Sequence, residues 1–299
     1  MTKEANVSTD ERRVLVLAHT GREAAVVAAE ELLKLLVVAG LTPMVMPKEA
    51  AGLSHSAQDL LTIADLDNPL DSAELVVVLG GDGTILRGAE LVRGGPVPLL
   101  GINLGHVGFL AESERDDLDY TVERIAARDY EVEERMTLDV TVHADGERIA
   151  QMWAVNEASV EKADRERLIE VVIEIDGRPV TEFGCDGVIL ATPTGSTAYA
   201  FSAGGPIVHP AIDALVLTPI APHTLTQRPL VLPASARIEV RPQADPQAEL
   251  LATIDGQFAV RLMPDDVVQI ARAPRVVRLL HTSSRTHFDM LRDRLKWGG

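Results

Sequence analysis

The chain has 299 residues, of which 46% are hydrophobic and 3% aromatic, so it can bury a sizeable core filled mainly by aliphatic side chains. Its 28 basic and 45 acidic residues give a formal net charge of −17. So acidic a surface repels nucleic acid and anionic lipid, and we expect neither nucleic acid nor a membrane as a partner.

The single cysteine, Cys185, excludes an intramolecular disulfide framework and favours a reducing compartment. Charged residues crowd the segment before the first apolar run, which is unlike a signal peptide, and no apolar run reaches the length of a membrane span. These features predict a cytoplasmic protein.

The first third of the chain alternates short apolar runs with helical patterns, which predicts an α/β domain with an open parallel sheet. A polar, irregular stretch at 47–71 is predicted to be a loop. The predicted strands are Val14–Ala18, Pro43–Met46, Leu75–Leu79 and Leu99–Asn103, and the predicted helices are Gly21–Val38 and Ile85–Val92.

After an acidic helix near Asp116–Arg128, apolar residues recur at every second position, which is typical of strands with one buried face. Asp145-Gly146 and Asp176-Gly177 each lie between two such runs and predict hairpins. We therefore predict an α/β domain at 1–128, a β-rich domain at 129–273, and a C-terminal segment at 274–299 that packs back on the first domain.

Gly80-Gly81-Asp82-Gly83-Thr84 directly follows the most apolar predicted strand and precedes a helix. Glycines leave backbone amides open to a phosphate chain, and a helix N-terminus favours an anion. A carboxylate in such a cradle suits a proton acceptor or a magnesium contact. The alternative is a tight turn in which Asp82 caps the helix.

Neither a P-loop nor a dinucleotide-fold fingerprint is present. Gly105-His106-Val107-Gly108-Phe109 follows a strand end and is either a second wall of the same crevice or a plain turn.

The pair Asn156-Glu157 interrupts an apolar strand. Its amide and carboxylate suit a purine edge and ribose hydroxyls, although a surface pair is equally compatible. The run Asp186–Tyr199 ends a buried strand in a loop of small hydroxyl residues, which can hold a polar ligand.

Taken together, these segments and Ile254-Asp255-Gly256-Gln257 resemble the NAD kinase family in order and spacing, over nearly the whole chain. The glycine motif alone is shared with diacylglycerol and sphingosine kinases, whereas the block Thr194–Tyr199 is far more specific. The sequence around Gly184-Cys185-Asp186 is similar to the corresponding segment of actinobacterial members.

The resemblance implies an active site between an α/β domain and a β-rich domain, in homodimers or homotetramers. It implies that Asp82 is catalytic, and we expect the amides of Gly80, Gly81, Gly83 and Thr84 to hold the phosphates of the donor. It further implies contacts to NAD at Asp82, Gly83, Arg87, Asn156, Glu157, Arg167, Asp186, Thr197, Ala198, Tyr199, Ser202, Ala221 and Gln257.

The implied reaction moves a phosphoryl group from ATP to the adenosine-ribose 2′-hydroxyl of NAD, which makes NADP. We expect Mg²⁺ to be held mainly by substrate phosphates, because the sequence shows no cage of carboxylates. The residues leave open whether inorganic polyphosphate serves beside ATP. Some members have arginine where this chain has Gly184, so we hypothesise that NADH is accepted beside NAD.

Two other functions stay open at this stage. A lipid kinase could use the same glycine motif, although the net charge is poorly suited to an anionic bilayer. A non-catalytic module could bind NAD without turnover, and only Asp82 and the donor site distinguish it from the enzyme.

Overall fold

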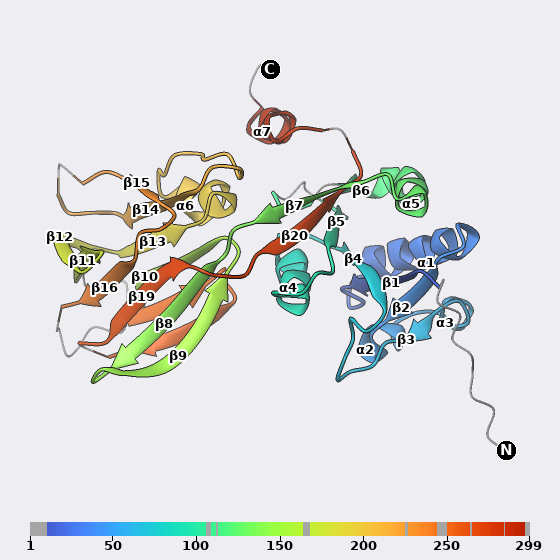
Figure 1. Ribbon diagram of the computed structural model, residues 1–299, viewed down its shortest axis with the longest axis horizontal. Helices are drawn as coiled ribbons and strands as arrows, with labels where there is room; N and C mark the ends of the chain where they lie inside the picture. Colours follow the sequence, from blue (N-terminus) through green and yellow to red (C-terminus); the bar gives the residue numbers. More distant parts are fainter. Residues whose placement is uncertain are drawn as a thin grey trace. The chain divides into compact units, whose positions relative to one another are not determined.

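The computed structural model describes residues 11–105, 109–111, 113–163, 168–224, 227–243, 250–263, 265–283 and 285–296 (Figure 1). The chain divides into two compact units. One consists of Met1–Glu134 with Arg278–Gly299, and the other of Arg135–Val277.

The first unit contains an eight-stranded sheet with the order β3-β2-β1-β4-β5-β20-β7, in which β6 also pairs with β5. The pairs from β3 to β20 are parallel. The strands are β1 (Arg13–Ala18), β2 (Thr42–Val45), β3 (Thr62–Ile63), β4 (Ala73–Leu79), β5 (Leu99–Asn103), β6 (Ser113–Glu114), β7 (Glu131–Arg135) and β20 (Val277–His281). The helices are α1 (Glu23–Val38), α2 (Pro47–Ala50), α3 (His55–Gln58), α4 (Asp82–Val92), α5 (Leu118–Ala127, after a 3-10 turn at Arg115–Asp117) and α7 (His287–Leu295).

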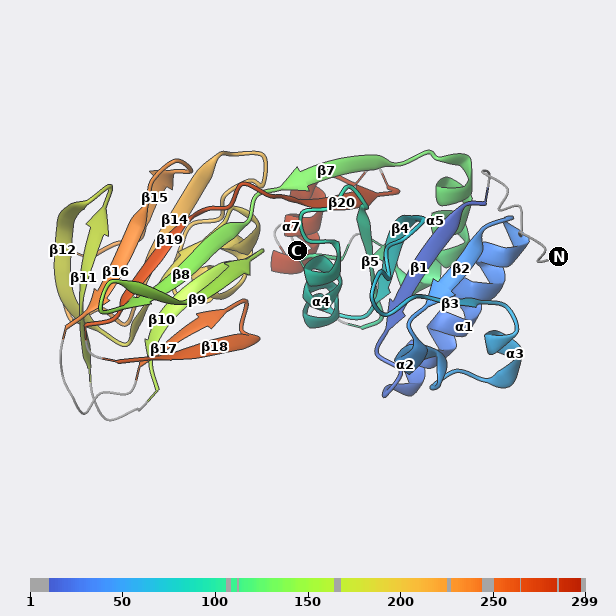
Figure 2. The same ribbon diagram turned by 60° about the horizontal axis from the view of Figure 1, so that its bottom comes forward.

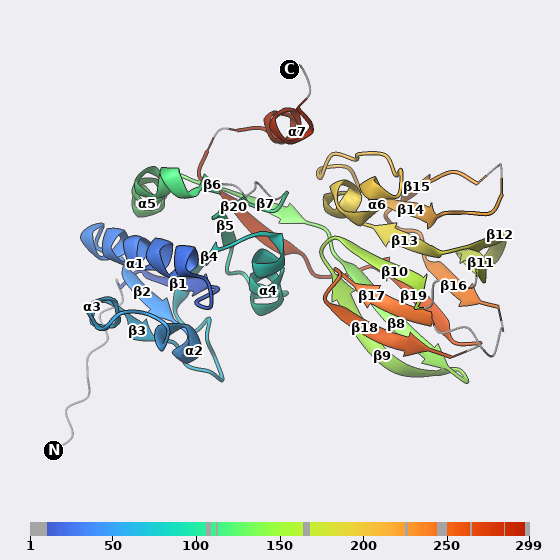
Figure 3. The ribbon, with the colours of Figure 1, turned by 180° about the vertical axis from the view of Figure 1, so that it is seen from behind.

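Strand β4 is apolar at successive positions because both faces of the sheet are covered. Leu75, Val77 and Leu79 belong to a core that includes the buried faces of α1 and α5. Helix α4 lies on the opposite face (Figure 3). It packs so closely that a Cβ on Gly88 would lie 2.6 Å from a methyl carbon of Val78. The predicted parallel α/β sheet is therefore confirmed.

The order of the strands reverses at β1, whose neighbours are β2 on one side and β4 on the other. In open α/β sheets such a reversal leaves a crevice at the carboxyl ends of the two central strands, where ligands bind. The loop after β4, which carries Asp82, therefore begins at the edge of the sheet where a ligand is expected.

The second unit has two six-stranded antiparallel sheets, with the orders β15-β14-β13-β10-β17-β18 and β12-β11-β16-β19-β8-β9 (Figure 2). Side chains from both sheets share one apolar core. The elements are β8 (Leu138–Ala144), β9 (Glu147–Ala154), β10 (Glu157–Lys162), β11 (Ile169–Ile175), β12 (Arg178–Cys185), β13 (Gly187–Ala191), η2 (Thr194–Thr197), α6 (Tyr199–Ser202), β14 (Ala214–Ile220), β15 (Leu230–Pro233), β16 (Ile238–Pro242), β17 (Leu250–Ile254), β18 (Phe258–Leu262) and β19 (Val267–Arg272).

Both predicted hairpins are confirmed. Asp145 and Gly146 have φ angles of 50° and 80°, and Asp176 and Gly177 have 51° and 75°. Two successive residues with positive φ are the requirement of a type I′ turn, which Asp-Gly meets at little cost.

Two expectations need correction. The stretch at 47–71 is not a plain loop, because it contains α2, α3 and β3. Asn156 does not lie within a strand: β9 ends at Ala154 and β10 begins at Glu157, and these strands belong to different sheets. Among the described residues, no helix combines the length and apolar character needed to cross a membrane.

Candidate functional site

The glycine loop lies between β4 and α4. Gly80 is required by packing, since a Cβ there would lie 2.6 Å from Thr84 Oγ1. A Cβ on Gly81 or Gly83 would meet no protein atom within 4 Å, and neither residue has a positive φ angle. The fold alone does not require these two glycines, so the space beside them is available to a ligand that approaches the backbone.

The carboxylate of Asp82 accepts two backbone hydrogen bonds from one segment. The amide of Phe109 donates to Oδ2 at 3.0 Å, and that of Leu110 to Oδ1 at 3.1 Å. Each oxygen keeps a further lone pair, so the side chain is fixed in place and can still accept a proton. The capping alternative is wrong, because the N-cap is Gly81 and Asp82 is the first residue of α4.

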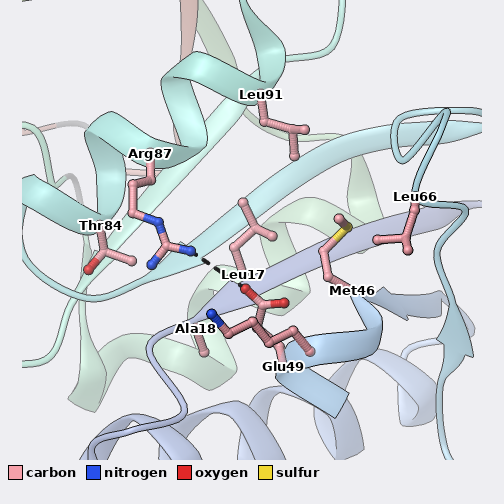
Figure 4. Close-up of a pocket in the computed structure, with 9 residues that line it drawn as sticks. Leu17, Ala18, Met46, Glu49, Leu66, Thr84, Arg87 and Leu91 are labelled. Carbon is pink, nitrogen blue, oxygen red and sulfur yellow. Dashed lines mark ion pairs between the residues drawn. The ribbon is translucent and has the colours of Figure 1, made fainter. Parts of the chain in front are cut away.

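Arg87 lies one turn further along α4 and lines a pocket in the first unit (Figure 4). Its guanidinium lies 3.8 Å from a carboxylate oxygen of Glu49 and is largely exposed. The structure therefore leaves Arg87 accessible to an anion, while the loop residues His106, Val107 and Gly108 fall outside the described residues.

Within the part of the chain that the structure describes, no cluster of three or more His, Cys, Asp or Glu side chains could hold a metal ion. Asp82 is the one carboxylate in the glycine loop. This donor set fits a cation such as Mg²⁺ only if substrate oxygens and water supply most of its ligands.

In the second unit, Asp255 holds the corner at which the chain passes from β9 to β10. Its Oδ2 accepts the amide of Val155 at 2.9 Å, and its Oδ1 accepts those of Asn156 and Glu157 at 2.8 and 3.0 Å. Asn156 and Glu157 are both buried, which excludes the surface-pair alternative. The corner, which we call the Asp255 corner, comprises Val155, Asn156, Glu157 and Asp255.

The loop after β13 packs directly on this corner. A Cβ on Gly195 would lie 2.0 Å from the carbonyl oxygen of Asn156. Thr192 donates its hydroxyl to the carbonyl of Val155 at 2.6 Å and its amide to the carbonyl of Asn156 at 2.8 Å. Two segments that are distant in sequence are thus fixed against each other through backbone atoms.

Glu157 is 7% exposed, and its Oε2 has no hydrogen-bond partner among the described residues. Burial, and secondarily the charge of Asp255, raise the pKa of Glu157 to about 8, although the backbone amide of Tyr199 donates to it. At neutral pH the side chain is therefore mostly protonated and can donate a hydrogen bond as well as accept one.

The opposite end of β10 holds a second polar group. Lys162 pairs with Asp186 at 2.5 Å, and the amide of Asp186 donates to Ile220, next to Ala221. Ala221 has a φ angle of 43°, which a residue with a Cβ rarely adopts. Glu157 and Lys162 are about 16 Å apart along the strand, at ~3.3 Å per residue.

Tyr199 lies between these two groups. Its hydroxyl donates to Glu161 at 2.9 Å, and burial, with this hydrogen bond, raises the pKa of Tyr199 to about 12. The ring is 37% exposed, so one face remains available to a ligand.

The other predicted NAD contacts fall into three groups. Thr197 is buried and donates its hydroxyl to Thr194, Ala198 follows it, and Ser202 is exposed on α6. Gln257 lies in the turn that also holds Asp255. Arg167 lies outside the described residues.

Sequence reasoning missed the partners that hold these residues. Glu161 and Lys162 are adjacent charged residues at the end of β10, whose other residues are buried, and such a pair is a signal that could have drawn attention to them. Nothing in the sequence indicates that Phe109 and Leu110 donate to Asp82, because this contact joins segments 27 and 28 residues apart.

An open glycine loop with one fixed carboxylate, and a β-rich unit with a buried polar corner, suit a nucleotide kinase without a P-loop. The comparisons with known proteins agree. The chain matches the model of the ATP-NAD kinase N-terminal domain over residues 14–130 and that of the C-terminal domain over 155–282. The chain belongs to the NAD kinase family.

Among curated relatives, it is 51% identical to NAD kinase 2 of Streptomyces coelicolor, with 95% of this chain and 93% of that protein covered. It is 50% identical to NAD kinase of Leifsonia xyli, with the same coverage. Among solved structures, yeast NADH kinase complexed with NADH has a TM-score of 0.85 at 26% identity and covers 97% of this chain and 89% of its own. An NAD kinase from Archaeoglobus fulgidus in complex with ATP has a TM-score of 0.71 at 27% identity, covering 96% and 100%.

Proposed function

We propose that this NAD kinase transfers the terminal phosphoryl group of ATP to the adenosine-ribose 2′-hydroxyl of NAD, with Asp82 as the proton acceptor. The observation that supports this most strongly is the glycine loop itself. Gly81 and Gly83 leave open space that the fold does not need, beside a carboxylate that two backbone amides hold in place.

Charge in a phosphoryl-transfer transition state is spread over oxygens, so catalysis depends on positioning and on stabilising that charge. The amides of Gly80 and Thr84 donate to the carbonyls of Ile102 and Gly81 at 2.9 and 2.8 Å, which corrects the expectation that they hold phosphate. The donor's phosphates therefore lie against the part of the loop between these two residues, at the N-terminus of α4. Asp82 accepts the proton of the attacking hydroxyl through a lone pair that its backbone hydrogen bonds leave available. Arg87 is accessible to a phosphate from the same helix.

Mg²⁺, when bound, neutralises charge on the transferring phosphoryl group. Asp82 is the side chain in the loop that would contact it or orient its water ligands, and substrate phosphates and water would supply the rest of its coordination.

The second unit recognises the dinucleotide. Asn156 and the mostly protonated Glu157 offer donors and acceptors that suit adenosine. Tyr199 is partly exposed, and the ion pair of Asp186 with Lys162, near Ala221, forms a separate polar group at the far end of β10. Thr197, Ala198, Ser202 and Gln257 belong to the same loops, and Arg167 is proposed from the resemblance alone.

An assay with four combinations of donor and acceptor tests this proposal. The purified protein is assayed with ATP or inorganic polyphosphate against NAD or NADH, and NADP or NADPH is measured. We expect NADP from NAD and ATP. We also expect NADPH from NADH, because Gly184 adds no arginine side chain to the lysine, Lys162, that already pairs with Asp186. NAD binding without turnover under every condition would instead indicate an NAD-sensing module.

Location and assembly remain proposals as well. We propose a cytoplasmic enzyme, since Cys185 is the single cysteine and is buried. We propose a homodimer or homotetramer, as the family implies, which sedimentation analysis of the purified protein would test.

A further inference from the structure

A pocket of about 310 Å³ in the first unit has no part in the site described so far except through Arg87 and Thr84 (Figure 4). It lies at the carboxyl end of β1, where the strand order reverses, and α4 forms one of its sides. Its walls combine aliphatic side chains with one carboxylate, Glu49, and two cations, Lys48 and Arg87.

The pocket adjoins the glycine loop. Thr84 lines the pocket and also packs over Gly80, the first residue of the loop. A ligand whose phosphates rest on the loop amides can therefore extend its remaining part past Thr84 and Arg87 into the pocket.

The aliphatic walls suit the faces of a planar base. Leu17, Met46 and Leu91 line the pocket, and Leu66 contributes a side chain that is 68% exposed. An aliphatic side chain so exposed at the edge of a pocket gains apolar contact when a ligand covers it. Ligand sites are usually apolar hollows with a few placed polar groups, and about 300 Å³ is the lower end of their range.

Glu49 is the placed polar group. Its side chain is 11% exposed, Arg87 lies 3.8 Å away, and no hydrogen bond from a described residue reaches its carboxylate. An ionised carboxylate is an acceptor only, so it pairs with a ligand N–H and repels a phosphate. Inorganic polyphosphate has no N–H to offer, whereas the amino group of adenine has.

We propose that this pocket binds the base of the donor nucleoside triphosphate, with the amino group of an aminopurine donating to Glu49. Arg87 and Lys48 then flank the path of the phosphates towards the glycine loop. This inference rests on the proposed function, and it identifies the donor as an adenine nucleotide in preference to inorganic polyphosphate.

The first test exchanges the acceptor at Glu49. Inosine triphosphate carries a carbonyl where ATP carries the amino group, and Glu49→Gln supplies an amide that donates to a carbonyl. We expect wild type to prefer ATP, and the ratio of kcat/KM for ATP to that for inosine triphosphate to fall about tenfold or more in the variant, as a changed buried hydrogen bond does. KM for NAD should not change.

The second test removes an apolar contact. Leu66→Ala should weaken ADP binding about threefold to tenfold, the effect of a partly buried leucine. Val38→Ala is the control, since Val38 is 87% exposed in the same unit and does not line the pocket. Binding is measured by calorimetry with NAD at saturation, so that ADP does not report on the NAD site.

The outcomes distinguish a failure of the proposed base pocket from a failure of the proposed NAD kinase reaction. If the protein makes NADP but both variants retain the wild-type ATP-to-inosine triphosphate ratio and ADP affinity, the pocket does not hold the base. If no NADP forms with any donor, the proposed function fails, and ADP binding by the variants alone decides the role of the pocket.

Discussion

Asp82 in the first unit and Asp255 in the second are both held by backbone amides, yet their surroundings differ. Asp82 accepts hydrogen bonds from two backbone amides and lies between Gly81 and Gly83, where an added Cβ would meet no protein atom within 4 Å. Asp255 accepts three amides, and the segment it holds is packed against Gly195.

The difference separates two uses of a carboxylate. An aspartate with spare lone pairs beside open space can take part in a reaction, whereas one engaged by three amides fixes the chain that presents other side chains. We propose that the loop of the first unit binds phosphate and that the Asp255 corner positions the residues that recognise the dinucleotide. Each substitution below changes a residue of one unit and leaves the other unit intact.

The largest effect is expected at Gly195. An added methyl group would lie 2.0 Å from the carbonyl oxygen of Asn156, so Gly195→Ala must displace the corner or the loop. We expect the free energy of unfolding, measured with urea, to fall by about 3 kcal/mol or more. Gly83→Ala is the matched control, with open space at its Cβ, and it should stay within about 1 kcal/mol of wild type. Equal losses would mean that the two regions are packed alike.

The next prediction concerns selectivity between NAD and NADH at Gly184, two residues before Asp186. It lies in β12, and a Cβ there would meet no atom closer than 3.9 Å, so a side chain can be accommodated. NADH differs from NAD by one positive charge and by ring shape. We expect Gly184→Arg to change the NAD-to-NADH ratio of kcat/KM by roughly tenfold to two-hundredfold. Gly184→Ala controls for bulk without charge, and an arginine variant with an unchanged ratio would show that Gly184 has no part in selectivity.

Glu157 tests the electrostatics of the corner. Because burial raises its pKa to about 8 from 4.5, the folded state holds a proton that the unfolded chain releases. The free energy of unfolding should therefore fall as pH rises between those values, by up to about 1.4 kcal/mol per pH unit. Glu157→Gln should lose this contribution, whereas Glu170→Gln, at an exposed position of β11, should follow wild type. Parallel pH profiles for wild type and Glu157→Gln would contradict the raised pKa.

Tyr199 is expected to give the smallest effect. Its hydroxyl donates to Glu161, and we propose that its ring packs on the dinucleotide. Tyr199→Ala should raise KM for NAD about threefold to tenfold with little change in KM for ATP, and Tyr199→Phe should retain most of the affinity. A change confined to the KM for ATP would move Tyr199 to the donor site.

Periodicity and turn chemistry were enough to predict much of the fold. The run at Leu75–Leu79 has no polar position because helices cover both faces, and that pattern is visible in sequence. The Asp-Gly turns are equally local. The stretch at 47–71 was misjudged because its helices have four residues each, too few to show a helical period.

The site was predicted in part. The residues that form the glycine loop and the Asp255 corner stand in recognisable motifs, but their partners do not. Phe109 and Leu110 contribute backbone amides, which any residue type could supply, so no sequence signal marks them. Likewise, Asn156 seemed to interrupt one strand, because only the pairing of β9 and β10 with different sheets shows the corner between them.

The claim that Asp82 is the proton acceptor is tested most directly by Asp82→Asn, which keeps the size of the side chain and removes its basicity. The carboxamide oxygen can still accept one of the two amides, from Phe109 or Leu110. The measurement is kcat for NADP formation together with the dissociation constant for NAD, on the same preparation. We predict a fall in kcat of roughly 10²–10⁴-fold with NAD affinity retained. A variant that keeps more than about a third of the wild-type kcat would contradict the assignment, since loss of a general base costs far more than that.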